Sequence, residues 1–185
     1  QANATYLDAG DWNDFANTII TNSPPEKDTV YAVIGAASIE KIIPSLRNLL
    51  RQYELKRVVP DLNVHMNLNW SDLTTLSIGS HNPLVVEPVT TGQLTKLLNY
   101  TGRFNINCLP LGCGSNMVGG DEAYDGIIIR MKDGVFAEID IKGEQVTAGA
   151  GVRLNRLVKT LAENSLGGGE PLIAIPGSVG GSARM

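Results

Sequence analysis

The sequence has few of the residues that build disulfide frameworks and metal sites. It contains two cysteines, Cys108 and Cys113, and two histidines, His65 and His81, among 185 residues. Two cysteines in a chain of this length make neither a disulfide-rich domain nor a four-ligand zinc site, and no metal-ligand spacing surrounds either histidine. We therefore expect two small buried thiols, no metal ion, and a protein of the reducing cytoplasm.

Clusters of basic charge and long apolar runs are also missing. Fifteen Lys and Arg residues stand against nineteen Asp and Glu residues, so the net charge is -4, and no basic cluster is present to follow a phosphate backbone. No apolar run approaches the ~20 residues of a membrane-spanning helix. The start, QANATYLDAGDW, lacks the basic region and apolar core of a secretion signal. We expect no nucleic-acid or membrane partner, and the first residue, Gln1, suggests a start inside a longer polypeptide.

The chain does contain enough apolar residues, 43%, for one ordinary domain or two small ones. Residues 11–22 have helical spacing, residues 29–37 are typical of a strand, and residues 38–54 carry the apolar stripe of a second helix. Pro44 should kink that helix or confine its regular part to the residues after the proline. This helix-strand-helix order is a piece of an α/β layer, and residues 55–72, which have no clean period, indicate a linker.

A β-α-β unit comes next. The pattern predicts a strand at 84–88, a helix at 89–102 and a strand at 106–111, and a right-handed crossover would make the two strands parallel in one sheet. Three further strands, at 126–131, 134–141 and 144–152, are separated by two-residue polar turns. Such turns predict consecutive hairpins and therefore antiparallel neighbours. An amphipathic helix is predicted over 153–170, with Arg153 and Arg156 on its outer, solvated side.

A first glycine-rich loop carries chemistry. In LPLGCGSNMVGG, Gly112 and Gly114 follow an apolar strand, and Ser115 and Asn116 come next. Glycines in such a loop can turn successive N–H groups into a nest that binds anions, and the two polar side chains add donors. The spacing is not a Rossmann fingerprint, because Met117 stands where the third glycine should be, nor a P-loop. On the pattern alone the loop is a plain turn or a phosphate cradle.

A second loop, IPGSVGG, has the same character. Pro176 fixes φ, the three glycines let the backbone approach a ligand, and Ser178 offers a hydroxyl. If a helix starts at Val179, its free N–H groups should point the same way. A ligand with two phosphates would use both loops together, whereas the alternative is two unrelated surface turns.

From about residue 66 onward the sequence resembles the UDP-N-acetylenolpyruvoylglucosamine reductase (MurB) family. The blocks that carry the resemblance are LTTLSIGSHNPLVVEP (73–88), LPLGCGSNMVGGDEAYDGIIIRM (109–131), VTAGAGVRLNRLVKTLAE (146–163) and GGGEPLIAIPGSVGGSARM (167–185). The resemblance implies a mixed α+β and α/β fold, with an FAD-binding domain of the vanillyl-alcohol-oxidase (PCMH) type at 73–185 that is incomplete at its C-terminal end. The implied FAD contacts are Gly112, Cys113, Gly114, Ser115, Asn116, Ile175, Gly177, Ser178, Gly180 and Gly181.

The same resemblance implies a function. In the family, NADPH reduces FAD, and the reduced flavin passes hydride to the enolpyruvyl group of UDP-N-acetylglucosamine enolpyruvate in peptidoglycan precursor synthesis. The serine, arginine and glutamate that act on the substrate lie beyond position 185, so no catalytic residue is assigned here, and Arg153, Arg156 and Arg184 are not expected to replace them. The 185 residues alone are expected to be inactive, to bind FAD weakly or not at all, and to self-associate through exposed edges.

Residues 6–50 are similar to the closing segment of the UDP-N-acetylmuramate–L-alanine ligase (MurC) family. This likeness implies a fused ligase–reductase, in which residues 1–57 are ligase-like, 58–72 form a linker and 73–185 bind FAD. Two other functions remain open. The chain could be a non-catalytic nucleotide-binding or docking module of such a fusion, or part of another oxidase of the same flavin superfamily.

Overall fold

The structure, a computed structural model, describes residues 39–184, with side chains from residue 46 onward. The chain divides into two compact units, Gln1–Arg47 and Asn48–Met185. The helix and strand predicted at 11–22 and 29–37 lie outside the described residues. The second unit carries the elements that position the site.

Helix α2 spans Ile39–Val58 and therefore continues on both sides of Pro44. The helix is thus not confined to the residues after the proline. Pro44 lies in the second turn of the helix, where its missing N–H removes a single backbone hydrogen bond. The second half of α2 belongs to the second unit, so the boundary falls at Arg47 rather than at residue 57.

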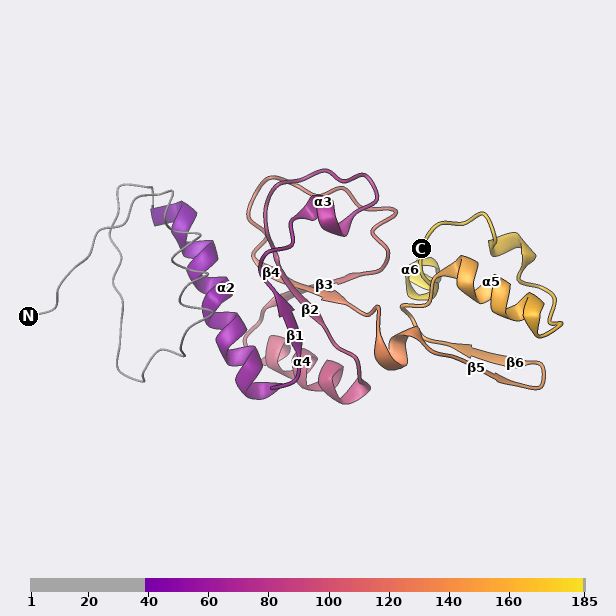
Figure 1. Ribbon diagram of the computed structural model, residues 1–185. Helices are drawn as coiled ribbons and strands as arrows, with labels where there is room; N and C mark the ends of the chain where they lie inside the picture. Colours follow the sequence, from indigo (N-terminus) through magenta and orange to yellow (C-terminus); the bar gives the residue numbers. More distant parts are fainter. Residues whose placement is uncertain (1–38, 185) are drawn as a thin grey trace, which may run out of the picture. The chain divides into compact units, whose positions relative to one another are not determined.

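The second unit is built around a four-stranded sheet with the order β1-β2-β4-β3 (Figure 1). The strands are β1 (Asn63–His65), β2 (Leu84–Glu87), β3 (Asn107–Leu111) and β4 (Gly126–Arg130). Strands β2, β4 and β3 are parallel, and β1 pairs antiparallel with β2. Helix α4 (Thr91–Arg103) joins β2 to β3, which confirms the predicted β-α-β unit, although β4 lies between its two strands.

The two central strands, β2 and β4, are buried on both faces, as in most parallel sheets. Successive residues of a strand point to opposite faces, so β2 and β4 feed two cores. One core packs the sheet against α2 and α4, and its buried members are Leu55, Val59, Leu62, Leu84, Val86, Leu97, Tyr100, Ile127 and Ile129. The other packs it against α3 (Trp70–Leu73), with Trp70, Leu73, Val85, Leu111 and Ile128 buried.

The interpretation of residues 58–72 as a linker is wrong for most of that segment. Strand β1 extends the sheet, and α3 brings Trp70 and Leu73 into the core. Elements of three and four residues are too short to show a period. Strand β1 has no fully buried residue, and α3 buries two. Most of this segment is therefore part of the sheet and its core.

The first predicted hairpin is also wrong. Strand β4 is a parallel strand inside the sheet, and Gly134–Ala137 forms a 3-10 turn, η1. Gly134 has φ +58°, and a Cβ there would overlap the carbonyl oxygen of Val89. The chain therefore turns away from the sheet at this glycine. The second predicted hairpin is confirmed, because β5 (Ile139–Lys142) and β6 (Gln145–Ala148) pair antiparallel.

The remaining elements are short. Helix α5 spans Leu154–Glu163 and ends well before residue 170, its predicted end, because Ser165, with φ +58°, has already left the helix. The turn η2 spans Glu170–Leu172, and α6 spans Val179–Arg184, which confirms a helix beginning at residue 179. Among the residues that the structure describes, no helix has the length and apolar character needed to cross a bilayer.

Candidate functional site: a cleft between two glycine loops

The first glycine loop leaves β3 at the carboxyl edge of the parallel strands, where α/β sheets commonly bind ligands. Gly114 has φ +66°, and a Cβ at this position would overlap the carbonyl oxygen of Leu73. The Gly114 carbonyl accepts a hydrogen bond of 3.0 Å from the N–H of Thr75. The end of α3 therefore fixes this loop, and only glycine fits at its centre.

Three N–H groups of this loop are available. Within residues 39–184, the N–H groups of Cys113, Gly114 and Ser115 have no hydrogen-bond acceptor. Successive N–H groups in a turn that contains a left-handed residue form an anion-binding concavity. The first loop thus has the donors that were predicted for it. The thiols of Cys108 and Cys113 are free and partly exposed, which corrects the expectation that both are buried.

The second loop differs, because most of its N–H groups are used inside the chain. The N–H of Val179 donates to Val152 O, and that of Gly180 donates to Ala150 O, both at 2.8 Å. The N–H of Gly181 donates to Ser178 Oγ at 3.3 Å. The expectation that the first N–H groups of α6 are free for a ligand is therefore wrong. Within the described chain, the N–H groups of Gly177 and Ser178 have no acceptor.

The two loops lie side by side although they are far apart in sequence. The hydroxyl of Ser115 donates to Pro176 O at 3.3 Å. A Cβ added to Gly112 would lie 2.5 Å from Ser178 Oγ, and one added to Gly177 would lie 3.4 Å from Ser115 Oγ. Glycine at these positions lets the loops meet. The two serines that were predicted to share one cleft are therefore neighbours.

A cavity of about 580 Å³ opens beside this contact, within the size range of small-molecule sites. Four of the predicted contacts line it, namely Cys113, Ser115, Ile175 and Gly177. The other six belong to the same two loops without lining the cavity, namely Gly112, Gly114, Asn116, Ser178, Gly180 and Gly181. The structure thus brings the predicted residues to one place and gives a subset direct access to the cavity.

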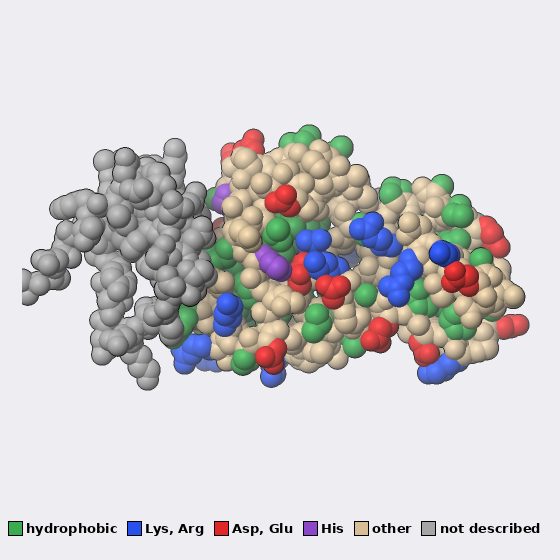
Figure 2. Space-filling model, in the orientation of Figure 1, with side chains coloured by type: hydrophobic (Ala, Val, Ile, Leu, Met, Phe, Trp, Pro, Cys, Tyr) green, Lys and Arg blue, Asp and Glu red, His purple; other side chains and the backbone are tan. Residues whose placement is uncertain are grey.

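Sequence reasoning missed several cavity residues, above all Arg130 at the end of β4 and Arg153 before α5. Arg153 was assigned to a solvated helix face, and it is exposed, but it also lines the cavity. Arg156 is exposed as predicted, and its Nη1 donates to Ala137 O at 2.9 Å. Lys and Arg side chains gather around the middle of the face drawn in Figure 2.

The donor set fits the diphosphate of a dinucleotide such as FAD. Two arginines line a cavity beside N–H groups without acceptors, and the absence of a Cβ on Gly112 lets the first loop lie against Ser178 of the second. Diphosphates are bound by such N–H groups and by arginine. Within the described residues, no group of three or more His, Cys, Asp and Glu side chains is placed to hold a metal ion.

Comparison with known proteins agrees with this chemistry. The FAD binding domain family matches residues 83–185, more than half of the chain. The chain therefore belongs to the FAD binding domain family. This membership confirms the predicted FAD-binding fold and the predicted cofactor, FAD.

More narrowly, the chain is similar to UDP-N-acetylenolpyruvoylglucosamine reductases. It is 32% identical over 112 residues to the one from Bacillus subtilis (strain 168), covering 60% of this chain and 37% of the relative. It is 33% identical over 134 residues to that of Methylorubrum populi, covering 71% of this chain and 43% of the relative. The crystal structure of the Thermus caldophilus reductase (MurB) superposes with a TM-score of 0.54 at 31% identity, covering 65% of this chain and 41% of that one. The chain spans less than half the length of these relatives.

Proposed function

We propose that the chain holds the FAD of a reductase that uses NADPH to reduce UDP-N-acetylglucosamine enolpyruvate to UDP-N-acetylmuramate in peptidoglycan precursor synthesis. The observation that carries the proposal is the meeting of the two glycine loops at one cavity, in a chain of the FAD binding domain family. The substrate class rests on the relatives, which are named UDP-N-acetylenolpyruvoylglucosamine reductases.

The first loop supplies the main anion contacts. The N–H groups of Cys113, Gly114 and Ser115 donate to the diphosphate, with Asn116 beside them, while the Ser115 hydroxyl, which donates to Pro176 O, holds the two loops together. Each hydrogen bond to a charged oxygen contributes about 1.5–3 kcal/mol. Gly112 keeps the approach open, because any side chain there would meet Ser178.

The second loop closes the site from the other side. Gly177 and Ser178 donate their N–H groups, and Ile175 offers an apolar surface. Gly180 and Gly181, whose own N–H groups are engaged, let this loop pack closely on Ala150 and Ser178. When bound, FAD supplies the hydride-transfer chemistry, and the residues of this chain bind and orient it. We assign no catalytic residue within these 185 residues.

Titration of the 185-residue chain with FAD tests the binding role. We expect saturable binding of one FAD per chain, measured by flavin absorbance and equilibrium dialysis, with weak affinity and therefore no rise of several degrees in the unfolding temperature. A protein that stays colourless in dialysis against excess FAD would contradict the role. A large rise in the unfolding temperature on adding FAD would contradict the predicted weak affinity, but it would support FAD binding by this chain.

A chimaera tests the activity. The matched region of the Bacillus subtilis reductase is replaced by residues 83–185 of this chain. We expect a yellow chimaera that oxidises NADPH only when the enolpyruvyl UDP-sugar is supplied. Oxidation of NADPH that does not depend on this substrate would indicate another flavin oxidase instead, and a colourless chimaera would count against the FAD role itself.

The proposal has three finer parts. The likeness of residues 6–50 to a ligase supports a fusion to an enzyme of the same pathway, and two free thiols support a cytoplasmic location. Strand β3 ends the described sheet on one side, which supports self-association through its edge. The intact mass of the parent polypeptide tests the fusion, and light scattering tests the association.

A further inference from the structure

We propose that Arg130, held in place by the buried Glu87, binds the diphosphate of the dinucleotide from the end of β4. This inference rests on the proposed function and adds a side chain to a site that was otherwise built from loop backbone.

The sheet places Arg130 beside the first glycine loop. Strands β3 and β4 are parallel, and Leu111, the last residue of β3, pairs in register with Arg130, the last residue of β4. The loop begins at the next residue, Gly112. Arg130 consequently lines the same cavity as Cys113 and Ser115.

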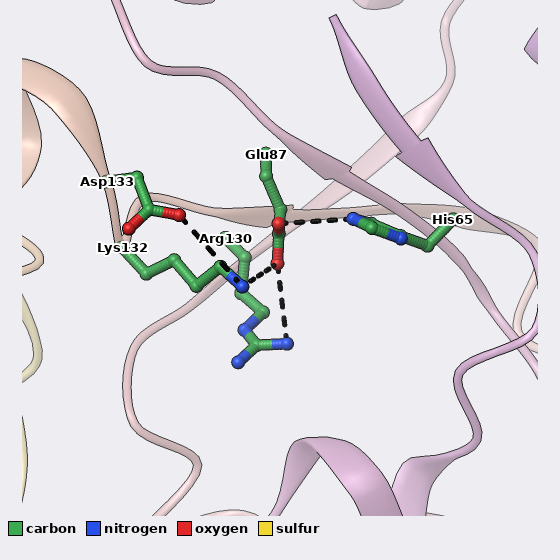
Figure 3. A network of polar contacts seen from close by, with 5 residues as sticks. All are labelled: His65, Glu87, Arg130, Lys132 and Asp133. Atoms are coloured by element: carbon green, nitrogen blue, oxygen red, sulfur yellow. Dashed lines mark hydrogen bonds and ion pairs between the residues drawn. The ribbon is translucent and has the colours of Figure 1, made fainter.

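Glu87 anchors this arginine (Figure 3). It ends β2, which is the other neighbour of β4, and it is only 4% exposed. Its Oε1 lies 3.4 Å from Arg130 Nη1 and 3.1 Å from Lys132 Nζ, and its Oε2 lies 3.1 Å from His65 Nε2. A buried carboxylate needs such partners, because an uncompensated charge in the interior costs several kcal/mol. Removal of this carboxylate should therefore release Arg130.

Arg130 is not saturated by this contact. Glu87 Oε1 makes ion pairs with two cations, but neither has the geometry of a hydrogen bond. A guanidinium carries five N–H donors in a rigid fork, and Glu87 approaches only one of its nitrogens. Lys132, the other cation beside Glu87 Oε1, is shared with a second carboxylate, because its Nζ lies 4.0 Å from Asp133 Oδ2. The side chain of Arg130 thus keeps donors for a second anion.

The charges around the cavity favour an anion. Its charged lining residues are Arg130, Arg153 and Asp72. The Asp72 carboxylate already accepts the N–H of Asn69 at 3.0 Å in the capping box of α3. Two cations therefore face the cavity against one occupied carboxylate. Because two arginines face the cavity, a diphosphate, which carries more negative charge than a single carboxylate, suits this site better.

The first test compares Arg130→Gln with Arg156→Gln, titrating FAD, ADP and riboflavin into the 185-residue chain by equilibrium dialysis. Arg156 is the matched control, because it is exposed, bonds a backbone carbonyl and does not line the cavity. We expect R130Q to weaken FAD and ADP by the same factor, about 10- to 100-fold, and to leave riboflavin, which has no phosphate, unchanged. R156Q should change none of the three affinities.

The second test separates positioning from direct contact. Glu87→Gln should weaken FAD, and the double variant E87Q/R130Q should be no weaker than R130Q, because Glu87 acts through Arg130. If E87Q does not fold, Arg130→Lys still tests the direct contact, because lysine keeps the charge but lacks the two-pronged guanidinium. We expect R130K to bind FAD several-fold more weakly than the wild type.

The outcomes are distinct. R130Q that binds FAD and ADP like the wild type, or that loses riboflavin to the same extent, overturns this inference while the proposed function stands. UDP is titrated into the same variants as a fourth ligand. R130Q that weakens UDP but not ADP overturns the inference in favour of the substrate as the source of the diphosphate. A wild-type chain that binds none of these ligands overturns the proposed function as well.

Discussion

The two glycine loops look alike in sequence and differ in how their backbone is used. The N–H of Thr75 holds the first loop by donating to Gly114 O, and the N–H groups of Cys113, Gly114 and Ser115 are left without acceptors in the described chain. In the second loop, the N–H groups of Val179 and Gly180 donate hydrogen bonds to carbonyl groups of the segment that precedes α5.

The two loops therefore have different roles in one site. A loop whose N–H groups are free can bind an anion, whereas a loop whose N–H groups are satisfied stabilises the fold and sets the position of its neighbour. Substitutions in the first loop should therefore act directly on FAD binding, whereas those in the second should act first on stability.

The largest effect is expected from Gly114→Ala. The alanine needs a left-handed φ and its Cβ overlaps Leu73 O, so we expect a loss of about 3 kcal/mol or more in the free energy of unfolding, and loss of FAD binding. The control is Gly143→Ala, where φ is a similar +61° and no atom lies within 4 Å. It should cost about 1 kcal/mol, and urea denaturation measures both. Equal losses in the two variants would mean that the Leu73 contact is unimportant.

Gly180→Ala should come next. The new Cβ would lie 2.8 Å from Ala150 Cβ and 3.0 Å from Ala150 O, so the loop must move away from Ala150. We expect this shift to cost about 1–3 kcal/mol of the free energy of unfolding. Gly181→Ala is the matched change one residue on, with 3.3 Å to Ser178 Oγ. We expect it to lie within about 0.5 kcal/mol of the wild type, because alanine favours the helix. Thermal unfolding ranks the two, and the reverse order would contradict the structural role of this loop.

Ser178→Ala should have a smaller effect. It removes the acceptor of the Gly181 N–H from a side chain that is 2% exposed, which should cost about 1 kcal/mol. Ser182→Ala, on an exposed residue of the same helix, serves as the control and should change stability little. If S178A lost FAD binding without losing stability, Ser178 would act on the ligand rather than on the loop.

The smallest effect concerns pH. Burial lowers the pKa of His81 below its usual 6.5, and its Nε2 is buried without a hydrogen-bond partner in the described residues. The unfolded chain therefore takes up a proton more readily than the folded one, so stability falls as pH drops through and below 6.5. His81→Gln should flatten this slope between pH 7.5 and 5.5 in urea titrations. An identical slope in the variant would show that other groups set it.

Local patterns predicted much of the fold. Residues 84–111 were assigned correctly because two apolar runs flank a segment of helical spacing, and Thr90 caps α4 through Gln93. Strand β4 was recognised as a strand, but its partners were not. An apolar run followed by Lys132 and Asp133 looks the same whether its neighbour precedes or follows it in sequence.

The two loops of the site were predicted from the sequence, but the residues that distant segments bring to it were not. The loops themselves could be read, because glycine and serine in a turn have a direct chemical meaning. Arg130 could not be assigned to the site from the sequence, because its position depends on the pairing of β4 with β3. The satisfied N–H groups of the second loop depend on the carbonyls of Ala150 and Val152, which its own sequence does not contain.

Amide NMR spectra of the chain with and without FAD test the central claim most directly. We predict that the signals of Cys113, Gly114, Ser115, Gly177 and Ser178 shift with FAD concentration, while those of Gly180 and Gly181 stay close to their positions in the free protein. Shifts confined to residues outside the two loops, such as the groove lined by Arg57, Lys96 and Arg103, would contradict it.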